Sequence, residues 1–314
     1  MRSTLIKHGL LFCSAFTLAL SGALQAQTVD NVRDAVTVGS QIDNALRDIQ
    51  SQSAAAQDGE VIDGEGGVFL LQQVDIFSVG VDAGLGYQDN PARTDVDDEG
   101  SLVASSSFFA GVATNLGNGF NIGGNLNLNV SEVEAADDLS NRSAVLSLYG
   151  SRRVVDDRIT VTLNTYFGSN LSTSLNTEST FYGATVSASS IFPAGQNRII
   201  RPVLSVARQL SDNEDQDNWS VTARVDGIWQ LRPRWRTNAS VSYTRRTYDD
   251  FFEEVTLTER IDRGWRANLG LAYLFSPMSD ITLTLGYGDQ DSSFFLSSYT
   301  ASDVNLAFQF GMRF

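Results

Sequence analysis

The sequence predicts an all-β protein: a transmembrane antiparallel up-and-down β-barrel of about 12 strands, preceded by a short N-terminal periplasmic helix. Three observations predict this fold class. Apolar and polar residues alternate with a period of two from residue 74 onward, which is typical of strands with two different faces. The connections between these segments alternate between short and long. Aromatic residues recur on one face of a strand at an interval of ten residues.

Residues 1-26 have the pattern of a secretory signal peptide. Arg2 and Lys7 form a short positive region, and the apolar run behind them is too short to span a membrane as a helix. Small residues follow this run, so we expect cleavage after Ala23 or Ala26. A retained anchor helix is the alternative interpretation.

The inventory of reactive side chains changes sharply after this segment, because Lys7, His8 and Cys13 are the only Lys, His and Cys in the chain. The predicted mature chain therefore lacks the residues for a Ser-His or Cys-His nucleophile pair and for a Cys/His zinc site. We predict no catalytic residues, no cofactor, no metal and no enzymatic activity. The formal net charge of −15 argues against nucleic acid as a partner, because that partner requires a basic surface.

Residues 27-73 lack the alternation of the rest of the chain. Val38, Ile42, Leu46 and Ile49 recur at helical spacing among charged residues, which predicts one short amphipathic helix in the periplasm. An acidic, glycine-rich linker completes this region. The sequence leaves three roles open for the helix: resting on the mouth of the barrel, plugging its lumen, or docking a periplasmic partner.

Residues 74-314 form the predicted barrel. In the last segment the even-numbered residues from Val304 to Phe314 are apolar, and the odd-numbered ones are polar or small. In a membrane barrel the apolar face meets lipid and the other face lines the lumen. A strand near Pro202 is doubtful, because proline cannot donate to a ladder and a closed barrel has no edge. The expected strands lie near residues 77–87, 102–115, 120–130, 143–154, 159–167, 180–192, 198–209, 219–231, 235–247, 265–275, 281–287 and 303–314.

The connections distinguish a barrel from a soluble sandwich. Strict alternation of short and long connections is what an up-and-down barrel requires, with tight periplasmic turns and longer outer loops. The long connections are acidic, and arginines lie in or beside the short ones at the presumed periplasmic rim, namely Arg152, Arg153, Arg158, Arg198, Arg232 and Arg234. The short connections lie near 117–119, 155–157, 193–196, 232–234 and 276–278. The long ones lie near 88–100, 131–142, 168–179, 210–218, 248–263 and 288–301.

The aromatic interval is an independent indication of a membrane. Trp219 and Trp229 lie ten residues apart on one face, as do Trp265 and Phe275. Ten residues of strand rise roughly 33 Å. A tilt of about 40° shortens this to roughly 25 Å along the membrane normal, which is the height of the lipid-facing band between two aromatic girdles.

The lumen is the candidate functional site. Counting by alternation places a set of arginines inward on four consecutive strands, and Asp226, Asp82 and Asp303 also point inward. A ring of arginines in a pore favours anions. The alternative is that these arginines pair with the aspartates in a structural network that fills a narrow barrel. The predicted inward arginines are Arg201, Arg224, Arg236, Arg246 and Arg266.

The last ten residues resemble the C-terminal assembly signal of bacterial outer-membrane β-barrels, which is an alternating apolar strand with a terminal aromatic residue. Phe310, Met312 and Phe314 carry the resemblance. It implies a porin-like barrel in the cell outer membrane that is recognised by the barrel-assembly machinery. Outer-membrane lipid and lipopolysaccharide are the other expected partners.

A second resemblance lies at the end of the first strand. Residues Gly86 to Pro91 look like the first hairpin of porin-like barrels that are encoded beside exopolysaccharide genes. The arginine-lined lumen is also similar in architecture to 12-stranded porins for acidic oligosaccharides. We therefore predict a porin-like channel for passive diffusion of small hydrophilic solutes, including anionic saccharides. The alternatives are an accessory barrel for exopolysaccharide export and a non-conducting structural or adhesive surface barrel.

Overall fold

A computed structural model describes the barrel region of the chain. The predicted signal peptide, the periplasmic helix with its linker, and Phe314 lie outside the described residues, so these expectations stay predictions. The structure describes residues 77–90, 100–117, 119–134, 140–155, 159–172, 175–194, 197–212, 216–252, 259–276, 279–293 and 298–313.

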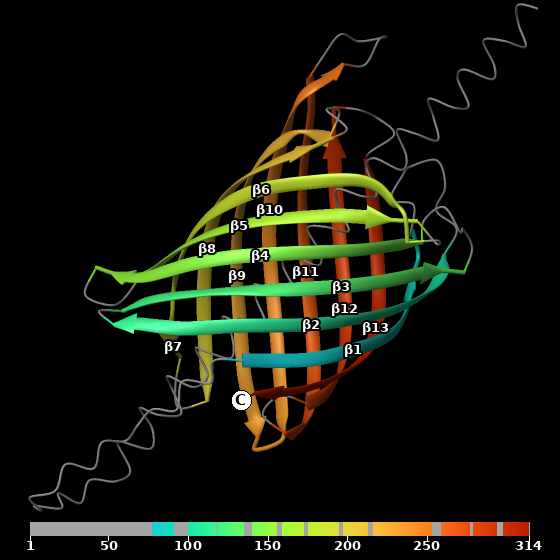
Figure 1. Ribbon diagram of the computed structural model, residues 1–314. Coiled ribbons are helices and arrows are strands. Elements are labelled where there is room, and N and C mark those ends of the chain that lie inside the picture. The colour runs from blue at the N-terminus through green and yellow to red at the C-terminus, as the bar shows by residue number, and fades with distance from the viewer. Residues whose placement is uncertain are drawn as a thin grey trace, which may run out of the picture. The chain divides into compact units, whose positions relative to one another are not determined.

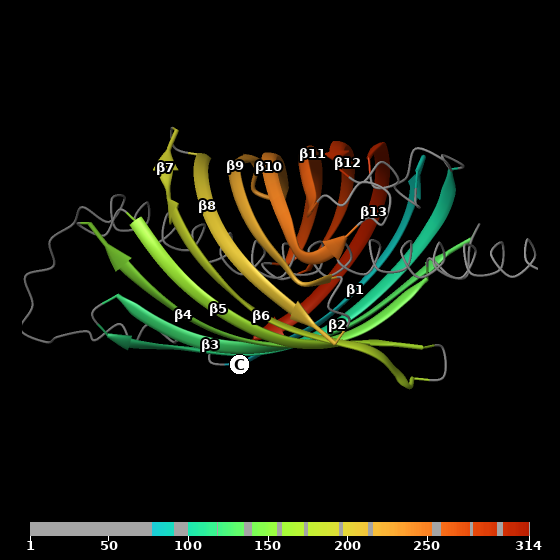
Figure 2. The same cartoon turned by 90° about the horizontal axis from the view of Figure 1, so that it is seen from above.

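The described chain forms one antiparallel sheet in which each strand pairs with its neighbours in sequence (Figure 1). Pairing of β1 with β13 joins the first and last strands, and pairing of β6 with β8 completes the ring (Figure 2). The strands are β1 (Phe77–Gln88), β2 (Ser101–Gly117), β3 (Phe120–Val133), β4 (Asn141–Val154), β5 (Ile159–Leu171), β6 (Thr177–Ser190), β7 (Phe192–Pro193), β8 (Arg198–Ser211), β9 (Asn218–Arg232), β10 (Trp235–Phe252), β11 (Glu259–Ser276), β12 (Ser279–Ser292) and β13 (Tyr299–Arg313).

The two-residue β7 continues β6, so the ring is a closed barrel of 12 strands, which confirms the predicted fold class. The predicted alternation of short and long connections is also present. The short connections share one end of the barrel with the start of β1 and the end of β13, where Ser78 lies opposite Arg313. In outer-membrane barrels the short turns lie on the periplasmic side, so the prediction that this end is periplasmic stays a prediction.

Pro202 lies inside β8, and the doubt about this strand was wrong. On one side Pro202 lies opposite Val225 of β9. On the other side the ladder with β6 stops at Val203 opposite Ser189 and resumes with β7 at Ile200 opposite Phe192. The proline therefore lies where the ladder is interrupted, and its missing N–H breaks no regular pairing.

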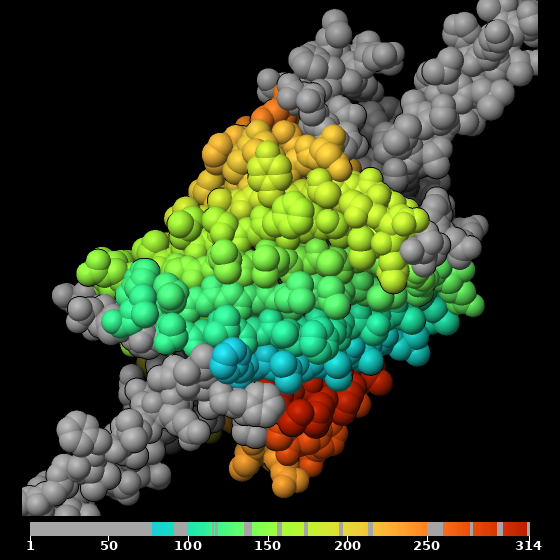
Figure 3. Space-filling model, in the orientation of Figure 1, coloured from blue at the N-terminus to red at the C-terminus, as the bar shows by residue number. Residues whose placement is uncertain are grey.

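The outer face carries the apolar half of every alternating strand. Exposed side chains such as Leu85, Leu306 and Val225 would not be stable in water in such numbers, but they suit hydrocarbon. Figure 3 shows β1 to β6 as a continuous outer surface. Aromatic rings flank this band, with Trp265 and Tyr287 5.2 Å apart between ring centroids. Within the described ranges no helix is long and apolar enough to cross a membrane.

Candidate functional site: the charged wall of the lumen

The exposed outer face shows which side chains point inward. On β9 the exposed Trp219, Val221 and Val225 are odd-numbered, so the even-numbered Arg224 and Asp226 face the interior. The same reasoning places the other four predicted arginines inward: Arg201 on β8, Arg236 and Arg246 on β10, and Arg266 on β11. We call the inward charged residues of β8–β13 and β1 the charged wall. It comprises Arg201, Arg224, Arg236, Arg246, Arg260, Arg266, Asp82, Asp226, Asp262, Asp280 and Asp303.

Asp226 is held by two arginines. Arg201 lies directly opposite it on β8 and donates from Nε and Nη2 to the same carboxylate oxygen, at 3.2 and 2.8 Å. Arg224, two residues away on the same face, donates from Nε to the other oxygen at 2.6 Å. The side chains of Arg201 and Asp226 are only 3% and 4% exposed. Removal of one member of this buried triad would leave an uncompensated charge in the protein interior, which is strongly destabilising. The three side chains therefore stabilise one another.

Two further pairs join strands across the charged wall. Arg266 on β11 forms an ion pair with Asp303 on β13 and also donates from Nε to Asn268 at 3.1 Å. Nearer the short turns, Arg236 approaches Asp280 at 3.7 Å between Nη2 and Oδ2. Of these residues Arg266 is the most open to the lumen, with 31% of its side chain exposed. This guanidinium therefore faces the lumen together with the carboxylate of Asp303.

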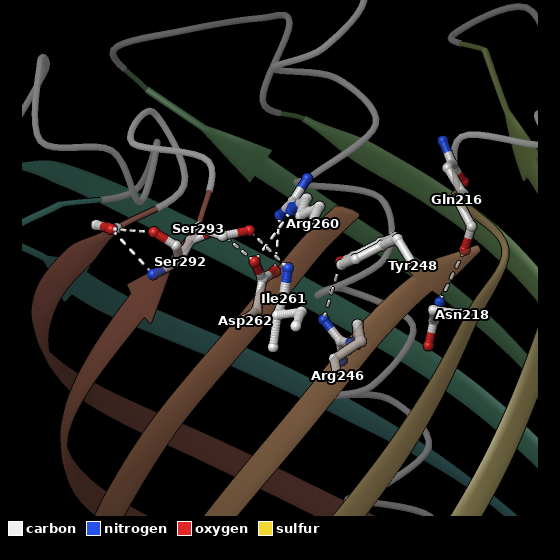
Figure 4. Close-up of polar contacts among 10 residues, drawn as sticks. Gln216, Asn218, Arg246, Tyr248, Arg260, Ile261, Asp262, Ser292 and Ser293 are labelled. Carbon is white, nitrogen blue, oxygen red and sulfur yellow. Dashed lines mark hydrogen bonds and ion pairs between the residues drawn. The ribbon is translucent and has the colours of Figure 1, made fainter. Parts of the chain in front are cut away.

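A cluster of buried polar side chains lies toward the long loops (Figure 4). Arg260 donates to both oxygens of Asp262 at 3.0 and 2.8 Å, and its guanidinium carbon lies 4.4 Å from the centroid of the Tyr248 ring. Arg246 donates to the Tyr248 hydroxyl at 3.5 Å, and the Ser292 hydroxyl donates to Asp262 at 2.5 Å. We call these five residues the mouth cluster.

Sequence reasoning missed Arg260 and Asp262 because residues 248–263 were expected to be a loop. That expectation was wrong: β10 continues to Phe252, and β11 already begins at Glu259. The missed signal was the continuing alternation, since Arg260 and Asp262 flank the outward Ile261.

Among the side chains that the structure describes, the charged wall holds six arginines and five aspartates, so this set has one excess positive charge. Among its aspartates, Asp82 accepts a hydrogen bond from the Ser107 hydroxyl at 2.7 Å. The described ion pairs match the network that sequence reasoning left open as the alternative to an unpaired arginine ring. Whether these residues set ion selectivity stays a prediction.

The inner surface of β1–β3 is different, and we call it the small-residue wall. Large rings on this side lie over glycines: a Cβ added to Gly80 would lie 2.3 Å from the Phe109 ring, and one added to Gly123 would lie 2.5 Å from Tyr149. The rings of Phe109 and Tyr149 therefore lie along the inner surface of the sheet, over these glycines. The small and amide-bearing inward residues of this wall include Ser78, Gly80, Gly84, Gly86, Ser105, Ser107, Gly111, Gly123, Asn125, Asn127, Asn129 and Ser131.

Comparisons with known proteins support the architecture. No protein-family model matches the chain, and no curated protein matches its sequence. Among solved structures, the chain is similar to the COG4313 outer membrane channel from Pseudomonas putida F1, with a TM-score of 0.53 and 11% identity over 80% of this chain and 100% of that one. The NanC porin gives a TM-score of 0.45 with 12% identity, over 73% of this chain and 98% of that one.

The KdgM porin, solved in complex with disordered oligogalacturonate, gives a TM-score of 0.37 with 10% identity, over 74% of this chain and 98% of that one. Of these three structures, the Pseudomonas putida channel is the one similar enough to bear on the architecture, and at 11% identity it shows the fold alone. The chain therefore has the fold of an outer-membrane β-barrel, and its apolar outer band is consistent with a location in the cell outer membrane.

Proposed function

We propose that the barrel is a porin-like channel for passive diffusion of small hydrophilic solutes. One observation carries this proposal: Ser105 points inward in the small-residue wall and is nevertheless exposed. Its cross-strand neighbours are Gly84 and Ser131, which leave space in front of it. Barrels of eight strands are just wide enough for side chains to fill, so 12 strands with one wall of small residues support an open path.

The chemistry of the two walls supports saccharides as the solute class. The small-residue wall offers hydroxyl and amide groups such as Ser107, Asn125 and Asn129, which can both donate and accept hydrogen bonds. The charged wall offers guanidinium groups whose charge is mostly balanced by aspartates. Neutral and singly anionic saccharides suit this combination better than strongly charged solutes.

A non-conducting structural barrel is the second candidate, and the mouth cluster is the observation that favours it. Arg246, Tyr248, Arg260 and Asp262 are each less than a tenth exposed, so this part of the interior is tightly packed. In this alternative the ion pairs stabilise the barrel and no solute passes.

Swelling of proteoliposomes separates the two candidates. Liposomes containing the full-length protein are transferred into isotonic arabinose, sucrose or raffinose, and the optical density is followed. A channel predicts swelling that is fast for the monosaccharide and slower for each larger sugar. Swelling no faster than in protein-free liposomes for all three sugars would contradict the proposed channel and support the structural barrel.

A further inference from the structure

Two arginines lie side by side on the outer face of the barrel. Arg245 of β10 and Arg263 of β11 are directly opposite each other in the antiparallel register. Both are exposed, and both share the outward, odd-numbered face with Tyr243 and Trp265. Cβ atoms of directly opposite residues lie about 4.5–5.5 Å apart, and like charges in this position are destabilising.

No carboxylate in the described part of the chain forms an ion pair with either arginine. Neither Arg245 nor Arg263 makes a hydrogen bond or an ion pair with a described residue. On their other sides they lie opposite Val221 and Asp291, respectively. On β12 both Asp291, directly opposite Arg263, and Asp289, diagonal to it, are outward and exposed, but neither forms an ion pair with Arg263. An external anion would remove the repulsion.

The position of the pair along the strands indicates which anion is available. Tyr243 and Trp265 are the next outward residues toward the short turns, and they are also directly opposite each other. Trp265 is in contact with Tyr287, so these rings belong to the aromatic belt that marks the membrane interface. Two residues of strand rise about 6.6 Å, and the outward Trp219 of β9 lies farther toward the long loops, opposite Thr247. The arginine pair therefore lies within the loop-side belt, at the depth of the lipid headgroups.

An apolar groove begins directly below the arginine pair. It has a volume of about 520 Å³ and extends across the outer face from the start of β5 to β11. Tyr243 and Trp265 line its upper end, while the small Ala188 and Ala223 leave it hollow beside Leu204. A groove on a lipid-facing surface is filled by hydrocarbon, so an acyl chain here would have its headgroup next to Arg245 and Arg263.

We infer that Arg245, Arg263 and this groove form a binding site for a phosphorylated glycolipid of the outer leaflet, with the phosphate on the arginine pair and an acyl chain in the groove. Guanidinium groups bind phosphate oxygens in a bidentate geometry and are only weakly hydrated, so they suit this position better than lysine would. The outer leaflet is the source because the pair lies on the long-loop side of the barrel. This inference is independent of conduction through the lumen.

The test measures binding of bisphosphorylated lipid A to the full-length protein in detergent micelles, by native mass spectrometry. The double variant Arg245→Gln with Arg263→Gln should bind at least tenfold more weakly than the wild type. Arg152→Gln is the matched control, because Arg152 is also outward and exposed but lies at the short-turn end, opposite Phe120 and Val161. It should bind within twofold of the wild type.

Two further arms identify the ligand chemistry. Dephosphorylated lipid A should bind the wild type as weakly as intact lipid A binds the double variant, and inorganic phosphate alone should bind at least tenfold more weakly than intact lipid A. Folding is checked by heat-modifiable migration in gels, and the charge-retaining variant with lysine at both positions should bind with intermediate strength. Equal binding of lipid A by the wild type and the double variant would overturn the inference, as would equal binding of lipid A with and without phosphates.

Discussion

Replacing Arg266 by glutamine should reduce the preference of the channel for anions. The substitution removes the guanidinium that pairs with Asp303 and leaves that carboxylate uncompensated at the lumen surface. The charged wall then loses its one excess positive charge. Because 31% of the Arg266 side chain is exposed, an ion in the lumen experiences this change directly.

The magnitude follows from Coulomb's law. One unit charge at about 8 Å from a permeating ion, with an effective dielectric constant of about 40 between protein surface and water, contributes about 1 kcal/mol. Loss of the charge raises the energy of an anion and lowers that of a cation by this amount, so the two effects add to about 2 kcal/mol. Because 1.4 kcal/mol corresponds to a factor of ten, we expect the ratio of anion to cation permeability to fall about 25-fold. Screening in physiological salt acts over about 8 Å, so the effect should be larger in dilute salt.

The assay is the reversal potential of the channel in a planar bilayer under a potassium chloride gradient. A charge-neutral control removes both partners, with Arg266→Gln and Asp303→Asn in one chain, and should restore a permeability ratio close to that of the wild type. An unchanged reversal potential in the Arg266→Gln variant, or an equal change in the single and double variants, would refute the electrostatic role of this pair.

Three other predictions concern the barrel itself. Gly183→Ala places a methyl group 2.3 Å from a backbone carbonyl oxygen and should destabilise the barrel by about 1–3 kcal/mol in urea unfolding, whereas Gly227→Ala, whose nearest neighbour is at 3.9 Å, should have little effect. Leu306→Arg in the lipid-facing band should cost about 2–4 kcal/mol in lipid vesicles, and a loss below 1 kcal/mol would place this residue outside the hydrocarbon. A single cysteine at Glu134, beside a long loop, should react with an impermeant maleimide on intact cells, while one at Arg234 should not, and the reverse result would invert the proposed topology.

The fold could be predicted from the sequence because alternation is a local property. Val304, Leu306 and Phe308 of β13 define a lipid face without reference to any other strand. The same property placed Arg224 and Asp226 on one side of β9. The prediction failed at the end of β10 and at the start of β11, because the alternation there was not followed beyond the expected strand ends. β10 continues to Phe252, and β11 begins at Glu259.

Which residues become partners could not be predicted in the same way, because pairing depends on register and not on the pattern within one strand. Arg201 lies opposite Asp226 only because β8 and β9 are aligned in that register. Arg266 reaches Asp303 across β12, so its partner is not even on a neighbouring strand. The sequence therefore left open whether the arginines form an unpaired ring or an ion-pair network.

Single-channel recording in planar bilayers tests the central claim, which is that the lumen is open to small solutes. The full-length protein, inserted from detergent into a bilayer in 1 M potassium chloride, should produce uniform and stable steps of current. The steps should become smaller when a polyethylene glycol small enough to enter the lumen is added, and stay unchanged with one too large to enter. Insertion of folded protein, verified by its heat-modifiable migration, without any steps of current would contradict an open lumen.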